Sequence, residues 1–174
     1  MDEIQRASRR ASILARQLLA SARLEPFDAA AFDANLRRKA EKLATGPEKG
    51  QALSGTILLV EDEASVRSLA RRILTQKGYR VLEASDGAVA LRVAAGHVGE
   101  IDLVLTDVAM PVLGGRGLVE ELRELSPGIR VLFMSGYPRE EVFPDVSNQT
   151  PYLQKPFTSE TLIAEVSSAL GIVR

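Results

Sequence analysis

Four short apolar runs in this sequence each end at side chains with reactive or metal-binding groups. These side chains are Glu61 and Asp62 after the first run, then Asp107, Ser135 and Lys155. Short apolar runs of this kind are typical of buried parallel strands, whose carboxyl ends lie at one edge of a sheet. Carboxylates, a hydroxyl and an ammonium gathered at that edge can hold a divalent cation and a phosphoryl group. We therefore expect phosphoryl chemistry there.

The carboxylates of Glu61, Asp62 and Asp107 would repel one another at this edge. Two like charges about 4 Å apart cost about 4 kcal/mol at an effective dielectric of about 20. A bound cation, or protonation of one acid, would relieve that repulsion. Carboxylate and carbonyl oxygens without histidine or cysteine ligands favour Mg²⁺, or Mn²⁺, which keeps water ligands and bridges to a phosphate. A divalent cation site is the prediction.

Five alternating strand and helix patterns must position these residues. We expect strands at 57–60, 80–84, 101–106, 130–134 and 152–154. The first helix should bury a stripe of Val66, Leu69, Ala70, Ile73 and Leu74, spaced as one face of a helix. Right-handed crossovers then favour an α/β fold, a doubly wound five-stranded parallel sheet of order 2-1-3-4-5. Pro144 would interrupt a helix in 136–151, so that helix should be short or irregular.

A different kind of pattern precedes the sheet. Residues 1–43 are expected to form a helical segment, 44–55 a linker rich in glycine, and 56–174 the main domain. Apolar residues recur every seven positions in 2–23, and a second amphipathic helix is predicted over 28–43. Helices this short need a partner to bury their apolar faces. We expect either a helical hairpin docked on the main domain or, as favoured, a homodimer through residues 2–43.

Composition excludes several other classes of protein. The chain is 45% hydrophobic and 26% charged, as is ordinary for a soluble globular protein, and it contains no cysteine. Arginines interrupt the N-terminal segment where a signal peptide would be apolar, and no run is long enough to span a membrane. The sequence lacks the dense run of basic residues that is typical of nucleic-acid-binding proteins, so nucleic-acid binding is not expected. A cytoplasmic location is the expectation.

Four segments resemble the signature segments of receiver domains of two-component response regulators. They are Val60-Glu61-Asp62-Glu63, Leu105-Thr106-Asp107-Val108-Ala109-Met110-Pro111, Met134-Ser135-Gly136-Tyr137 and Gln154-Lys155-Pro156-Phe157. The resemblance covers about residues 55–172, and each segment falls at its expected strand end. It implies a flavodoxin-like receiver fold and Mg²⁺-dependent phosphorylation of an aspartate.

The resemblance also implies a role for each matched residue. Asp107 would be the phosphoacceptor, Lys155 would contribute its ammonium, and Ser135 would bind a phosphoryl oxygen. Glu61, Asp62 and Asp107 would bind the metal together with the backbone carbonyl of Ala109. Tyr152 would be the aromatic switch, although an aromatic residue there serves edge-strand packing equally well. The bond between Lys155 and Pro156 would be cis, which is uncommon for X–Pro bonds in general.

The leading functional hypothesis is a stand-alone phosphorelay receiver that a histidine kinase or histidine phosphotransfer protein phosphorylates. It would not be an enzyme beyond catalysing its own phosphorylation and dephosphorylation. Residues 4–20 are similar to a dimerisation helix of hybrid histidine kinases, which raises the alternative of a kinase remnant acting as a phosphate sink. An aspartate-nucleophile phosphatase is a further alternative. Such enzymes carry a second aspartate two residues after the nucleophile, where this chain has Ala109.

Overall fold

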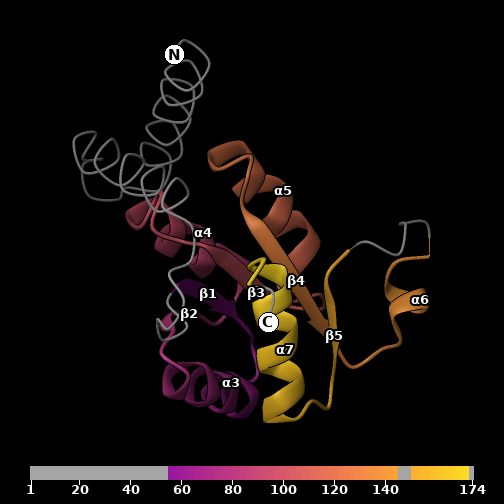
Figure 1. Ribbon diagram of the computed structural model, residues 1–174. Coiled ribbons are helices and arrows are strands. Elements are labelled where there is room, and N and C mark those ends of the chain that lie inside the picture. The colour runs from indigo at the N-terminus through magenta and orange to yellow at the C-terminus, as the bar shows by residue number, and fades with distance from the viewer. Residues whose placement is uncertain (1–54, 145–149, 173–174) are drawn as a thin grey trace.

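The computed structural model describes residues 55–144 and 150–172, which form a parallel sheet with helices on both faces (Figure 1). The strands are β1 (Thr56–Val60), β2 (Arg80–Ala84), β3 (Leu103–Asp107), β4 (Arg130–Ser135) and β5 (Tyr152–Gln154). The helices are α3 (Ala64–Gln76), α4 (Gly87–Gly96), α5 (Gly115–Leu125), α6 (Arg139–Val142) and α7 (Ser159–Ala169). The predicted helical segment, its dimer and residues 44–54 of the predicted linker lie outside these residues.

The strand order is β2-β1-β3-β4-β5, which confirms the predicted order. Val60 lies level with Thr106 of β3, and Asp107 lies level with Met134 of β4. Ser135 in turn lies level with Gln154 of β5. This register aligns the carboxyl ends of β1, β3, β4 and β5, so the residues that follow or end these strands lie at one edge.

Two hydrophobic clusters hold the layers together, one on each face of the sheet. Leu58 and Val104 point to the cluster that α4 and α5 cover, whereas Ile57 and Leu103 point to the cluster that α3 and α7 cover. Both faces of β1 and β3 are therefore buried, which explains why their sequences read as continuous apolar runs instead of alternating.

The helices begin at local signals. Asp86 caps α4 by accepting a hydrogen bond from the Val89 N–H, 2.8 Å away. Thr158 and Thr161 form a reciprocal capping box at the start of α7. Such caps satisfy N–H groups that the first helical turn leaves unpaired. α6 has four residues, which confirms the short helix expected from Pro144.

One element of the predicted core was wrong. Leu69 was expected in the buried stripe of α3, but it is 41% exposed, whereas Ala70, Ile73 and Leu74 are buried. Leu69 lies at the border of that stripe, beyond the arc of the helix that reaches the sheet. The prediction from 3.6-residue spacing therefore placed the buried face correctly but extended it too far on one side.

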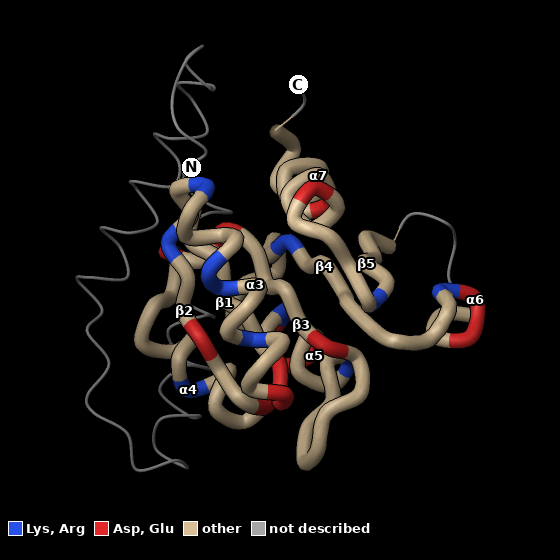
Figure 2. Tube along the Cα trace, turned by 90° about the horizontal axis from the view of Figure 1, so that it is seen from below, with Lys and Arg blue, Asp and Glu red and all other residues tan. Residues whose placement is uncertain are grey.

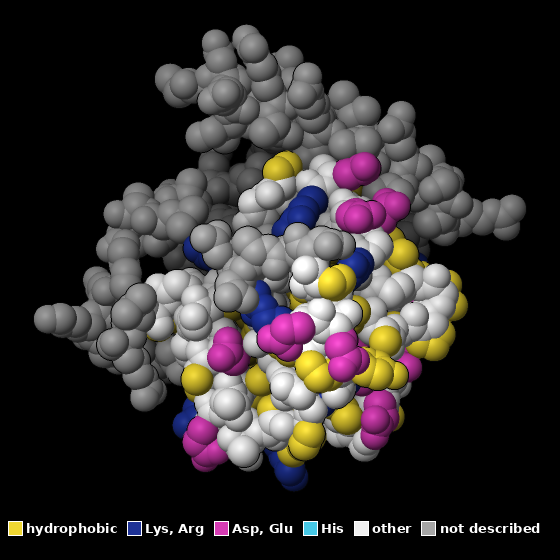
Figure 3. Space-filling view, turned by 90° about the vertical axis from the view of Figure 1, so that its right-hand side faces the viewer, with side chains coloured by type: hydrophobic (Ala, Val, Ile, Leu, Met, Phe, Trp, Pro, Cys, Tyr) yellow, Lys and Arg dark blue, Asp and Glu magenta, His cyan; other side chains and the backbone are white. Residues whose placement is uncertain are grey.

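One face of the described surface is mixed in charge. On the face shown in Figure 3, acidic, basic and apolar side chains lie among one another without a continuous basic stripe. α3 differs from this pattern, because it carries Arg67, Arg71 and Arg72 and no acidic residue (Figure 2). None of the helices in the described ranges is both long and apolar enough to cross a membrane.

Candidate functional site

The three predicted carboxylates meet at the carboxyl edge of the sheet. Oxygens of Glu61, Asp62 and Asp107 all lie within 4.8 Å of one another. Glu61 is 1% exposed and Asp107 is 8% exposed, whereas Asp62 is open to solvent. The parallel register of β1 and β3 brings these residues together although they are far apart in the sequence.

Lys155 neutralises two of these carboxylates. Its Nζ lies 2.6 Å from Oε2 of Glu61 and 2.5 Å from Oδ2 of Asp107. Its backbone N–H donates to the Ser135 carbonyl at 2.7 Å, which fixes the residue just beyond β5. Burial alone would lower the pKa of Lys155, but hydrogen bonds and charges from Asp107 and Glu61 outweigh burial and raise that pKa. The ammonium is therefore held charged at neutral pH.

Both oxygens of the Glu61 carboxylate are engaged. Oε2 accepts from Lys155, and Oε1 accepts from the Glu63 N–H at 3.3 Å. Burial raises the pKa of Glu61, and Lys155 opposes that rise. Arg67 donates to the Glu61 carbonyl at 2.6 Å and so anchors the start of α3 to the end of β1. Sequence reasoning missed this role of Arg67, for which one arginine in a helix gives no distinctive signal.

The donor set of this edge fits a hard divalent cation. Three carboxylates lie together, and no histidine or cysteine belongs to the cluster in the described ranges. Asp62 is the most exposed of the three carboxylates, and a carboxylate oxygen of Asp107 lies within 4.8 Å of it. The backbone of Ala109 lies close to this carboxylate, because its N–H donates to Oδ1 of Asp107 at 3.0 Å. These residues suit Mg²⁺, which prefers a few carboxylate or carbonyl oxygens and keeps several waters.

A glycine behind Asp107 lets the loop after β3 pack closely. A Cβ on Gly115 would lie 2.2 Å from the backbone oxygen of Asp107, far inside van der Waals contact. The Gly115 N–H donates to the Val108 carbonyl at 3.1 Å and closes the loop. Sequence reasoning did not identify this close packing of Gly115 behind the aspartate.

Ser135 and Tyr152 lie on the other side of Asp107. Ser135 is buried at the end of β4, and its Oγ accepts from the Tyr137 N–H at 3.3 Å. The Tyr152 hydroxyl donates to the Tyr137 carbonyl, and its ring meets the Phe143 ring edge-on at 6.1 Å. Burial raises the pKa of Tyr152. Its position fits both the predicted switch and the edge-strand packing left open as an alternative.

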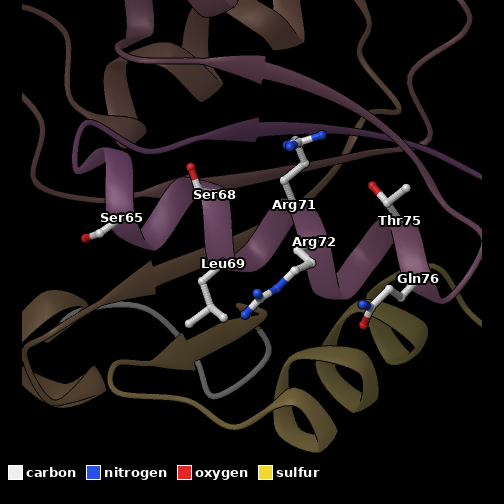
Figure 4. Close-up of a pocket in the computed structure, with 7 residues that line it drawn as sticks. All are labelled: Ser65, Ser68, Leu69, Arg71, Arg72, Thr75 and Gln76. Atoms are coloured by element: carbon white, nitrogen blue, oxygen red, sulfur yellow. The ribbon is translucent and has the colours of Figure 1, made fainter.

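Two further features frame the site. The bond between Lys155 and Pro156 is cis, as expected. An open hollow runs along α3, from Ser65 near the start of the helix past Leu69 and Arg72 to Gln76 (Figure 4). The hollow is lined by none of the three carboxylates, so the sheet edge is the candidate site and this hollow is not.

Comparison with known proteins agrees with this geometry. The family model described as "Response regulator receiver domain" matches residues 57–167. The sensor kinase CckA of Brucella abortus is 38% identical over 144 residues, which cover 80% of this chain and 15% of that protein. A probable transcriptional regulator, ycf27 of Cyanidium caldarium, is 34% identical over 118 residues, which cover 66% of this chain and 45% of that protein. The chain thus spans less than half of either relative.

Solved structures show the same likeness. The receiver domain of the hybrid histidine kinase CckA has a TM-score of 0.58 and 40% identity, covering 67% of this chain and 99% of that one. The chemotaxis protein CheY4 of Vibrio cholerae has a TM-score of 0.58 and 28% identity, covering 67% and 98%. Together with the family match over more than half of the sequence, these likenesses show that the chain belongs to the response regulator receiver domain family.

Proposed function

We propose that this protein is a phosphorelay receiver whose Asp107 accepts a phosphoryl group from a phosphohistidine of a histidine kinase or histidine phosphotransfer protein. The observation that carries the proposal is the contact of Asp107 with the Lys155 ammonium, within the cluster that Asp107 forms with the Glu61 and Asp62 carboxylates. The protein itself would be no kinase. It would catalyse only its own phosphorylation and dephosphorylation.

The residues of the site suit each part of the transfer. A carboxylate oxygen of Asp107 forms a bond to phosphorus while the bond from phosphorus to the donor imidazole nitrogen breaks, and the donor keeps that electron pair. Lys155 would move from Oδ2 of Asp107 to a phosphoryl oxygen, and the Ser135 hydroxyl would donate a hydrogen bond to another. Mg²⁺ held by Glu61, Asp62, Asp107 and the Ala109 carbonyl would offset the charge of the phosphoryl oxygens.

A small phosphodonor tests this proposal directly. With acetyl phosphate and Mg²⁺, the intact mass of the protein should rise by one phosphoryl group, and Asp107→Asn should abolish the rise because an amide is a poor nucleophile. Intact-mass spectrometry gives the readout. Modification that persists in Asp107→Asn would disprove the assignment of Asp107.

The same experiment discriminates the phosphatase alternative. An aspartate-nucleophile phosphatase would release inorganic phosphate over many turnovers, because a second acid would activate water for the second step. Ala109 cannot do so, and no other acid follows Asp107 closely in the sequence. We expect one phosphoryl group per chain and little release of inorganic phosphate.

The kinase-remnant alternative differs from the proposal in the role of the N-terminal segment. Its phosphate-sink role would use the same phosphorylation of Asp107.

Magnesium should stabilise the fold by offsetting the repulsion among the carboxylates. A ligand at ten times its dissociation constant that binds only the folded state adds about 1.4 kcal/mol to the free energy of unfolding. Thermal melts with and without Mg²⁺ should show this gain, and Asp62→Ala should remove it. Asp62 is the matched choice because it is exposed, so its loss leaves no buried gap. A wild-type melting curve that Mg²⁺ leaves unchanged would argue against the cation site.

A further inference from the structure

One aromatic ring holds the segment after β4 against the sheet. Phe143 is 7% exposed, whereas residues 136–142 are exposed or half-buried, and α6 lies outside β5 (Figure 1). The centroid of the Phe143 ring lies 5.2 Å from that of Phe133 in β4 and 6.1 Å from that of Tyr152 in β5. Tilted and edge-on pairs of this kind are favourable arrangements of aromatic rings. The placement of this segment therefore depends on what surrounds Phe143.

A cation from α5 covers the Phe143 ring. The Cζ atom of Arg116 lies 4.7 Å from the ring centroid, where the electron-rich face of the ring attracts a guanidinium. No carboxylate pairs with Arg116 within the described residues, so in that part of the chain its charged partner is the ring and not an acid. Arg116 directly follows Gly115, which packs against the backbone oxygen of Asp107. The start of α5 thus links the phosphoacceptor to Phe143.

The Tyr152 side of this aromatic cluster leads back to the site through hydrogen bonds. The Tyr152 hydroxyl donates to the Tyr137 carbonyl, and the Tyr137 N–H donates to Oγ of Ser135 at 3.3 Å. Because Oγ accepts from Tyr137, the proton of the Ser135 hydroxyl stays available for a phosphoryl oxygen. Movement of Tyr152 would release the Tyr137 peptide and, with it, the orientation of that hydroxyl.

We propose that Arg116 is a positioning residue for the phosphorylation of Asp107. Its guanidinium fixes the Phe143 ring, and through Tyr152 that ring fixes the peptide that orients the Ser135 hydroxyl. Arg116 acts through these residues and not by contact with the phosphoryl group. This inference rests on the proposed function, because the orientation of the Ser135 hydroxyl affects labelling only if Asp107 accepts a phosphoryl group.

Substitutions at position 116 separate the charge from the rest of the side chain. Arg116→Gln removes the cation and keeps a polar side chain, whereas Arg116→Lys keeps a cation that can stack on the ring. Arg123→Gln is the matched control, because Arg123 is an exposed arginine in the last turn of the same helix. Labelling of the full-length chain by acetyl phosphate with Mg²⁺ is followed by intact-mass spectrometry, at a temperature below the melting transition of every variant.

We expect Arg116→Gln to slow labelling by about fivefold, the effect of losing one cation–π contact. Arg116→Lys should recover most of the rate, and Arg123→Gln should match the wild type. Equal labelling of Arg116→Gln and the wild type would overturn the inference. An equal slowing in Arg116→Gln and Arg123→Gln would overturn it too, because any lost positive charge would then slow an anionic donor. Failure of acetyl phosphate to label the wild type would instead overturn the proposed function.

A double-mutant cycle separates positioning from a general structural role. Tyr152→Phe keeps the ring beside Phe143 but removes the hydroxyl that holds the Tyr137 carbonyl. If Arg116 acts through that hydroxyl, Arg116→Gln should slow labelling by less than about twofold in the Tyr152→Phe background. The full slowing in both backgrounds would overturn the inference, because Arg116 would then act by another route. So would a Tyr152→Phe protein that is labelled as fast as the wild type, because the hydroxyl would then not orient Ser135.

Discussion

Replacing Lys155 with methionine is expected to lower the free energy of unfolding by up to about 3 kcal/mol at neutral pH and to slow phosphorylation of Asp107 at least about a hundredfold. The ammonium contacts Glu61 at 2.6 Å and Asp107 at 2.5 Å, and Glu61 is almost fully buried. Removing one partner of a buried ion pair leaves an uncompensated charge, which is strongly destabilising. Losing one donor to a developing anion costs about 10²–10³ in rate.

The stability loss has an upper bound, because Glu61 can take up a proton instead of staying charged. Protonating a carboxyl of ordinary pKa 4.5 at pH 7 costs about 3.4 kcal/mol, at about 1.36 kcal/mol per pH unit. Methionine keeps the length and the apolar stem of lysine, so the change reports on the charge and little on packing.

The loss should depend on pH with a definite sign. Burial raises the pKa of Glu61 in the folded protein, and the charge of Lys155 lowers it, so the variant should have a higher Glu61 pKa than the wild type. A group whose folded pKa is raised stabilises the fold below its unfolded pKa, and this stability is lost as pH rises through the folded value. The deficit of Lys155→Met should therefore be small near pH 4.5 and grow toward pH 7.

Urea denaturation across this pH range, in EDTA to remove divalent cations, gives the free energies directly. Lys77→Met is a matched control, because Lys77 is an exposed lysine at the end of α3. It should change stability by less than about 0.5 kcal/mol at every pH. A deficit of Lys155→Met that does not vary with pH would show that Glu61 is not the group left unpaired.

The sequence predicted the sheet edge well because its signals are local and repeated. Buried parallel strands are apolar on both faces, so a short apolar run marks each strand, and polar side chains such as Glu61 and Asp107 mark its end. The strand order then follows from handed crossovers. Ser135 and Lys155 could be placed by the same logic, and the structure brings Lys155 and Asp107 together.

What sequence reasoning missed depends on distances between segments remote in the chain. That Lys155 engages Glu61 depends on the length of two side chains across the sheet edge, so Glu61 was predicted as a metal ligand alone. The left-handed conformation of Val112 could not be predicted, because the residue type argues against it. The exposure of Leu69 reflects how far α3 is rotated against the sheet, which periodicity determines only coarsely.

The close packing of Gly115 against the end of β3 is another feature that depends on distances between separate segments. Gly115→Ala should lower the free energy of unfolding by about 3 kcal/mol, because its Cβ would lie 2.2 Å from the backbone oxygen of Asp107 and 3.0 Å from Oγ1 of Thr106. The backbone oxygen cannot turn aside as a flexible side chain can. Relief requires α5 or the end of β3 to shift, and either shift displaces the phosphoacceptor.

Gly96→Ala is the matched control, and it should change the free energy of unfolding in the opposite direction. Gly96 is the last residue of α4, and a Cβ there meets nothing within 4 Å. Alanine should raise the free energy of unfolding by about 0.5–1 kcal/mol, because it loses less backbone freedom on folding than glycine. Thermal melts should therefore separate the melting temperatures of the two variants by about 10 °C or more.

Acetyl phosphate labelling below the melting transition should be slowed in Gly115→Ala alone, since misplacing a reacting group by about 1 Å lowers the rate by about a hundredfold. A Gly115→Ala protein as stable and as reactive as the wild type would show that the loop after β3 does not depend on close packing behind Asp107.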